Sequence, residues 1–486
     1  MLRLSIARCL TAALCLTLAA QALPGQDPRA RLSPQQAQED FDVLQRALAE
    51  AHGGYTRFVT ASDLDRRFAA HRTRLERPVT SLELAGVLSE TIAELRDGHA
   101  RLEFDSVTIA ALSTAQLLPL RLALEQDRLV VRLNDSPTDR FIAPGMELVS
   151  INGRSSAQII DILLPKVSGD GFIETGRRYR LAQDLARLYW LYVEQVSSYT
   201  VVARNAAGQQ VTAQMAGVSD AERRTSTNPV NTSMLQNTAR LDGPPGRVAL
   251  EFLDGGRVAR LRVRAFDGQT FVATLDSVFL ELSRRGTTSL LLDLRGNGGG
   301  VDEYGARLVS YFTTRPFRYF ERIHVTTIAP SFATWLPQTF DSMRNGTVPA
   351  PGGGFLVTPA LHPGVGEQQP AAPFFGGRIV VLIDGGSFST TADVAAQLQS
   401  WNRAVFIGEE TAGTYEGNTS GLNALIILPH SKLRLRVMMY GYWNAVTPVP
   451  GGRGVIPEHT VRLRVADILE GRDPALDLGL AVLTRQ

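Results

Sequence analysis

Two short runs of consecutive apolar residues restrict the fold of this chain more than any other feature. Residues 289–294 read SLLLDL, and residues 379–383 read IVVLI. Apolar runs without alternation are typical of strands covered on both faces, as in a parallel sheet that lies between helices. A glycine-containing turn and then a helical pattern follow each run. The sequence therefore predicts an α/β layer, with further strands at residues 258–263 and 404–407 and helices at 270–284 and 303–312.

The region before this layer has two different patterns. Apolar residues at helical spacing predict helices over residues 36–51, 62–75 and 81–95. From residue 117 the period changes to two, which predicts strands. These strands are expected at 118–124, 128–133, 147–151, 198–203 and 210–215, with helices at 156–164 and 179–193. We therefore expect a helical N-terminal unit over residues 23–105 and a small β-rich module over residues 112–217.

The remaining segments are assigned from composition. Residues 218–246 are rich in Ser, Thr, Asn and Pro, which predicts a linker or a long surface loop. We expect the α/β core to span residues 247–466 and a C-terminal tail to span residues 467–486. Residues 345–377 are rich in Gly and Pro, which predicts an irregular insertion or a lid.

The first 22 residues are typical of a secretory signal. Arg3 and Arg8 precede an apolar run over residues 9–20, and Ala20-Gln21-Ala22 fits a cleavage site. The run is short for a transmembrane helix, and an uncleaved anchor is the alternative. The only two cysteines lie inside this segment, so the mature chain would contain no disulfide and no thiol nucleophile. We expect a periplasmic or extracellular protein without an integral membrane segment in the mature chain.

Charge and histidine spacing exclude some classes of function. The chain has 50 Lys and Arg residues against 48 Asp and Glu residues, and no basic stripe that would indicate a nucleic-acid partner. No two histidines stand four residues apart, and no HExxH motif occurs. We therefore expect no metal and no cofactor.

A serine-rich turn is the first candidate for chemistry. Ser387 and Ser389 follow the strand at 379–383 and precede a helix, where free N–H groups can stabilise negative charge. Thr390 and Asp393 have the spacing of a capping box, which predicts that Thr390 caps the helix and leaves Ser389 free. The alternative is that Ser387 or Ser389 is itself only a helix cap.

Two further segments carry residue types that suit catalysis. His99 lies in the turn LRDGHA, between a predicted helix and a predicted strand, although a single histidine is often an ordinary partly buried residue. Residues 293–300 read DLRGNGGG, a strand end whose glycine amides could face an anion. The Lys-Ser/Thr pair of a P-loop is missing, and a tight turn required by packing is the alternative.

These separated segments together resemble the carboxyl-terminal processing, or tail-specific, serine protease family. DLRGNGGG is similar to the signature D-x-R-x-N-x-G-G, residues 380–413 to the nucleophile segment and residues 452–461 to the closing segment. LRDGHARLEF, residues 95–104, resembles the histidine segment of the tricorn-like, retinoid-binding-protein-like branch. The resemblance implies a protease core of the ClpP/crotonase-like type and a PDZ-like domain at residues 112–217.

The resemblance also implies a mechanism. Ser389 takes the nucleophile position, His99 that of the general base, and the amides of Thr390, Gly298 and Gly299 that of the oxyanion hole. The implied activity is hydrolysis of peptide bonds in unfolded or carboxyl-terminal segments of a peptide or protein substrate, through a serine acyl-enzyme. A non-catalytic binding protein on the same fold, which takes an apolar ligand or a peptide, is the alternative.

The sequence departs from the family pattern in two places. Thr414 stands about where Ser-Lys members carry lysine, and the only lysines are Lys166 and Lys432, so a Ser-His pair is expected. The tricorn-like branch supports its histidine with a glutamate before the closing segment, but no acidic residue occurs between positions 417 and 456. The candidates for a supporting acid are Glu458, Glu410 and Glu416, and a hydroxyl group is the other alternative.

Overall fold

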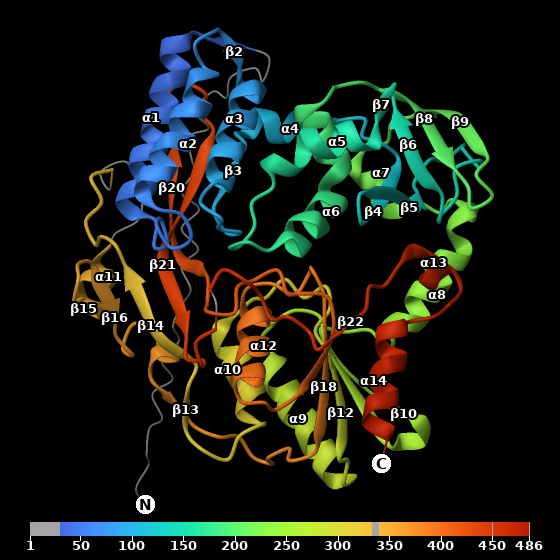
Figure 1. Cartoon of the computed structure of the whole chain (residues 1–486), viewed down its shortest axis with the longest axis vertical. Coiled ribbons are helices and arrows are strands. Elements are labelled where there is room, and N and C mark those ends of the chain that lie inside the picture. Colours follow the sequence, from blue (N-terminus) through green and yellow to red (C-terminus); the bar gives the residue numbers. More distant parts are fainter. Residues whose placement is uncertain (1–29, 333–339, 450, 486) are drawn as a thin grey trace, which may run out of the picture.

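The computed structural model describes residues 30–332, 340–449 and 451–485. Figure 1 shows three parts: a helical N-terminal unit, a β-rich module and a larger α/β core. The expected signal segment lies outside the described residues, as do both cysteines. No helix in the described ranges combines the length and the apolar character needed to span a membrane.

The core contains a six-stranded sheet in the order β10-β11-β12-β18-β19-β22. Strands β11 to β22 run parallel along this order, and β10 is antiparallel to β11. The bounds are β10 Val248–Leu253, β11 Val258–Val263, β12 Ser289–Asp293, β18 Arg378–Ile383, β19 Val405–Gly408 and β22 His459–Thr460. The predicted α/β layer is therefore confirmed.

Helices cover both faces of this sheet, which explains the unbroken apolar runs (Figure 1). On one face, Leu290, Leu292 and Val381 pack into the main core with α9 (Phe271–Arg284), α10 (Asp302–Ser310) and α12 (Thr390–Ser400). On the other face, Leu291, Val380 and Leu382 pack against α14 (Pro474–Thr484).

A second sheet connects the core to the N-terminal unit. Its strands follow the order β15-β16-β14-β21-β20, and β3 also pairs with β21. The bounds are β3 Arg101–Glu103, β14 Phe320–Val325, β15 Thr347–Pro349, β16 Phe355–Val357, β20 Thr419–Ile427 and β21 Arg434–Asn444. Because β3 follows directly after His99, its antiparallel pairing with β21 brings the predicted histidine to the core.

The helical unit contains α1 (Pro34–Ala51), α2 (Ala61–Thr73) and α3 (Ser81–Ala93), close to the predicted bounds. Ser33 and Thr80 form capping boxes at the starts of α1 and α3, which explains where these helices begin. The β-rich module has the strand order β4-β5-β6-β8-β9. Its elements are α4 Ser106–Thr114, β4 Leu120–Glu125, β5 Arg128–Asn134, β6 Glu147–Ile151, β7 Arg154–Ser155, α5 Ser156–Leu163, α6 Glu174–Tyr192, β8 Ser198–Arg204 and β9 Gln210–Ala216.

Three segments differ from the prediction made from composition. The expected linker contains α7 (Asp220–Thr225) and α8 (Thr232–Asp242), and Met234 of α8 is buried beside Val130 and α13 (Val465–Leu469). The expected tail contains α14, which closes one face of the core sheet. The expected irregular insertion forms short strands, β15 and β16, that extend the second sheet. The residues against which these elements pack lie in other parts of the chain, which local composition does not reveal.

Candidate active site

Ser389 lies at the sharp turn between β18 and α12. Its backbone has φ 57° and ψ −131°, a left-handed conformation that a non-glycine residue adopts only when the surroundings enforce it. Ser389 occupies the N-cap position of α12, but its side chain makes no capping hydrogen bond. A strand–turn–helix of this kind presents a serine hydroxyl at the edge of a sheet.

Thr390 does not cap the helix, so that prediction is wrong. It is the first residue of α12, and its Oγ1 donates to the carbonyl of Gly300 (2.9 Å) and to Asp302 (3.0 Å). The left-handed backbone at Ser389 starts the helix one residue earlier than the capping-box spacing suggested. Thr390 therefore ties the start of α12 to the glycine loop.

Ser387 has a different environment from Ser389. It is completely buried, and its Oγ donates to the carbonyl of Leu294 (3.0 Å) and accepts from the amide of Asp384 (3.1 Å). This serine holds the turn together, and its hydroxyl is not available to a substrate.

His99 lies against Ser389, although 290 residues separate the two in the chain. Its Nε2 is 3.1 Å from Ser389 Oγ, and its ring packs on the ring of Phe388 with the centroids 4.4 Å apart. Burial is the main cause that lowers the pKa of His99 to about 4, and the nearby Arg180 adds to this effect. The imidazole is therefore neutral at pH 7, the form that can accept a proton.

Asp97 and His52 lie behind the imidazole, and the sequence did not indicate a role for either. One oxygen of Asp97 accepts the backbone N–H of His99 (2.7 Å) and is 3.9 Å from its Nδ1. The other oxygen is 2.6 Å from Nε2 of His52. Because Nδ1 of His52 accepts the amide of Gly54 (3.1 Å), Nε2 carries the proton and donates to Asp97.

The charge state of Asp97 follows from these contacts. Burial opposes its ionisation, but the hydrogen bond from His52 outweighs burial and holds the pKa of Asp97 well below its usual range. Asp97 is thus a buried carboxylate beside the base. Its place two residues before the histidine in a glycine turn is a signal that the sequence did contain.

The three glutamates considered as supporting acids are bonded elsewhere, so that prediction is not supported. Glu458 accepts the amide of Phe406 (2.6 Å), and Glu416 accepts the amide of Gly452 (2.6 Å). Glu410 accepts the amide of Gly454 (2.8 Å) and pairs with Arg453. Glu410 and Glu416 hold the backbone of the closing segment, and Glu458 ties that segment to β19.

The glycine loop after β12 lies directly against the serine turn. The amide of Phe388 donates to the carbonyl of Asn297 (3.0 Å). A Cβ atom at Gly299 would lie 2.7 Å from Cβ of Ser389, so only glycine fits there. The amide of Gly299 donates to the side chain of Asn297 (2.9 Å) and is not free to bind an oxyanion, which corrects that prediction. Within the described residues, the amides of Gly298 and Thr390 donate to no acceptor.

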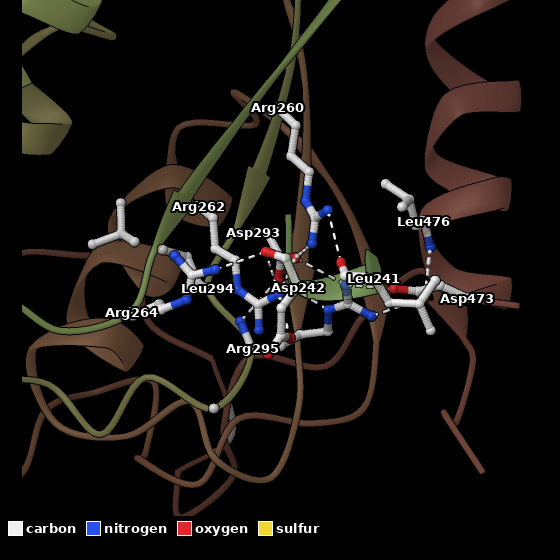
Figure 2. Close-up of polar contacts among 12 residues, drawn as sticks. Leu241, Asp242, Arg260, Arg262, Arg264, Asp293, Leu294, Arg295, Asp473 and Leu476 are labelled. Carbon is white, nitrogen blue, oxygen red and sulfur yellow. Dashed lines mark hydrogen bonds and ion pairs between the residues drawn. The ribbon is translucent and has the colours of Figure 1, made fainter. Parts of the chain in front are cut away.

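The charged residues of the DLRGNGGG segment have a structural role (Figure 2). The carboxylate of Asp293 is completely buried and accepts from Arg260 (2.7 Å) and Arg295 (2.9 and 2.8 Å). Arg295 also pairs with Asp473, the N-cap of α14 (2.9 and 2.8 Å). Burial opposes the charge of Asp293, but its arginine partners hold its pKa well below the usual range. This network fixes the start of the glycine loop and docks α14.

A cavity of about 580 Å³ opens beside His99, Gly298 and Phe388. Its walls come from the helical unit and the β-rich module, and it has the size of a binding site for a peptide side chain or a small ligand. Apolar side chains, among them Ile92, Leu102, Phe104, Leu188 and Leu191, share its walls with the charged side chains of Arg101, Lys166, Arg180 and Asp184. In the described ranges, one group has the donor spacing of a cation site, formed by Asp97, His99 and Asp170.

Comparisons with known proteins concern the family and the fold of the chain. Residues 257–457 match the model of peptidase family S41. A search of the curated proteins found no match. The crystal structure of mature CPAF superposes with a TM-score of 0.65 at 15% identity, covering 92% of this chain and 96% of that chain. The structure of mature CPAF complexed with lactacystin gives 0.64 at 15% identity, covering 92% and 97%. At this identity the likeness shows a shared fold.

Proposed function

We propose that this chain is an exported serine peptidase of family S41 that hydrolyses peptide bonds in unfolded or carboxyl-terminal segments, with Ser389 as nucleophile and His99 as general base. The observation that carries the proposal is the 3.1 Å contact between Nε2 of His99 and Oγ of Ser389. A serine hydroxyl is a weak nucleophile, and a neutral imidazole at this distance can take its proton.

The reaction divides into acylation and deacylation. Oγ of Ser389 attacks the substrate carbonyl carbon while its proton passes to Nε2 of His99. The imidazolium then gives this proton to the leaving amine, and the peptide bond breaks. A water molecule, activated by the same imidazole, hydrolyses the acyl-enzyme and restores the serine.

The oxyanion of both tetrahedral intermediates needs hydrogen-bond donors. The amides of Gly298 and Thr390 flank Ser389 and are free within the described residues. One donor of this kind contributes about 10²–10³ in kcat. Asp97, 3.9 Å from Nδ1, supplies negative charge that stabilises the imidazolium.

The proposals of export and of substrate type rest on observations other than the contact between Ser389 and His99. The first 22 residues have the pattern of a secretory signal, and no cysteine follows Cys15. The cavity beside His99 combines apolar with charged side chains, and its apolar part can take an apolar side chain of an extended substrate. We therefore place the enzyme in the periplasm or outside the cell.

The proposal is tested with Ser389→Ala and His99→Ala. A denatured protein and fluorogenic peptides with free or amidated carboxyl termini serve as substrates. We expect kcat/KM to fall by about 10³-fold or more in each variant, because nucleophile and base act as a unit.

Matched controls are Ser277→Ala, on the exposed surface of α9, and His459→Ala, which is exposed in β22. Both should keep the activity of the unmodified chain. Turnover that persists in both site variants would refute the assignment. Equal rates on free and amidated peptides would refute recognition of the carboxyl terminus while leaving the peptidase intact.

A further inference from the structure

Asp170, in the loop before α6 of the β-rich module, is a buried carboxyl group that the catalytic steps above do not use. It is only 2% exposed. One of its oxygens accepts the amide of Gly98 (2.6 Å), the residue immediately before the catalytic base. The other oxygen, Oδ2, is buried and has no hydrogen-bond partner among the described residues.

His99 has a complementary free atom. Its Nδ1 is also buried and has no hydrogen-bond partner in the described part of the chain. One oxygen of Asp170, one oxygen of Asp97 and one ring nitrogen of His99 lie within 4.8 Å of one another. No hydrogen bond joins Oδ2 of Asp170 or Nδ1 of His99 to another described group, and atoms within this distance are close enough for one water molecule to join them.

We propose that Asp170 is a positioning residue for His99: it fixes the Gly98–His99 backbone and, with Asp97, places a second carboxyl group at the imidazole. This inference rests on the proposed function of His99 as the base. Asp170 comes from a different module than His99, whereas the three candidate glutamates are bonded elsewhere. Asp170 adds to the electrostatic support of the imidazolium by Asp97, whose carboxylate lies 3.9 Å from Nδ1 of His99.

The charged groups around Asp170 determine when it carries charge. Burial and the adjacent carboxylate of Asp97 raise its pKa to about 7, whereas the Gly98 amide and the guanidinium groups of Arg180 and Arg57 lower it. Asp393 of α12 is a further carboxyl group that interacts with it. Asp170 therefore ionises as the pH rises through about 7, and its negative charge then favours the imidazolium that forms during acylation.

A purely structural role predicts a different outcome. A structural Asp170 would only accept the Gly98 amide, and an asparagine can accept the same N–H through its side-chain oxygen. Asp170→Asn keeps this acceptor and removes the ionisable carboxyl group. Asp170→Ala removes both. The asparagine variant therefore separates positioning of the base from support of the backbone.

The experiment measures kcat and KM for a fluorogenic peptide from pH 5 to pH 9, with thermal unfolding recorded for each variant. We expect Asp170→Asn to keep its melting temperature and KM, to lose about tenfold or more in kcat at pH 8, and to lose the rise in kcat near pH 7. Asp161→Asn, an exposed carboxyl of α5 in the same module, is the control and should match the unmodified chain.

An Asp170→Asn variant with the kcat and pH profile of the unmodified chain would overturn the inference. If this variant does not fold, Asp170→Ala, which also removes the carboxyl group, is measured instead, and a kcat and pH profile equal to those of the unmodified chain would again overturn the inference. The Ser389→Ala variant separates a failure of the proposed peptidase function from a failure of the proposed role of Asp170. If it keeps turnover, the proposed function fails. If it is inactive while Asp170→Asn is unaffected, only the role of Asp170 fails.

Discussion

At the scale of single residues, the site depends on backbone conformations that only certain residue types adopt without strain. Ser389 has a positive φ without being glycine, and Gly299 packs against it with φ 101°. A left-handed non-glycine residue costs on the order of 1–3 kcal/mol and persists only when its neighbours enforce it. The neighbours here are the glycine loop and the first turn of α12, joined through Thr390 and Gly300.

Gly299→Ala should therefore disturb both stability and catalysis. Its Cβ would lie 2.7 Å from Cβ of Ser389 and 2.8 Å from the carbonyl of Phe388, on a backbone that disfavours alanine. We expect a loss of at least about 2 kcal/mol in the free energy of unfolding, measured by urea titration, and a lower kcat. The control for stability is Gly298→Ala, where a Cβ meets no atom within 4 Å. Equal stability of the two variants would contradict this account of the loop.

The sequence could indicate part of the site because some signals are local. Ser389 and His99 lie in short motifs, and the structure brings them into contact. The prediction that the amide of Gly299 is free to bind an oxyanion was wrong. This amide donates to the side chain of Asn297, a contact that depends on how the loop folds back. The three candidate glutamates are bonded elsewhere in the structure, because the partners of a carboxylate depend on tertiary packing. Their roles, and those of Ser389 and His99, stay predictions until the variants are assayed.

At the scale of elements, the turns after β12 and β18 meet because the two strands are parallel neighbours. Asp293 lies beside Leu382 in the register, and the amide of Leu294 continues the pairing to Leu382 (3.0 Å). Both loops therefore leave the sheet at its carboxyl end, as expected for parallel strands. Helix α14 supports the same edge from the opposite face through Asp473 and Arg295.

Asp473→Ala should destabilise the core through this contact. The change removes the N-cap of α14 and leaves the buried Arg295 with one carboxylate partner fewer. We expect a loss of about 3–5 kcal/mol in the free energy of unfolding, by urea or thermal denaturation. Asp477→Ala, an exposed position of the same helix, is the control and should change stability by less than about 1 kcal/mol. A similar small loss in both variants would mean that α14 behaves as a tail after all.

At the scale of the whole molecule, the site is assembled from three parts of the chain. The core supplies Ser389, the N-terminal unit supplies His99 through the pairing of β3 with β21, and the β-rich module supplies Asp170. The apolar strands of the core were predictable because a strand buried on both faces has an unbroken run of apolar residues in the sequence. The helices at 220–225, 232–242 and 474–484 were not, because the surfaces that bury them belong to distant segments.

The most direct test of the central claim is covalent labelling of the folded chain with a fluorophosphonate, followed by intact-mass measurement and peptide mapping. An activated serine beside its base reacts with this probe, whereas a binding protein on the same fold does not. We predict one equivalent of label per chain, located on Ser389, and strongly reduced labelling in His99→Ala. A folded chain that takes up no label, or that carries it on another serine, would contradict the account.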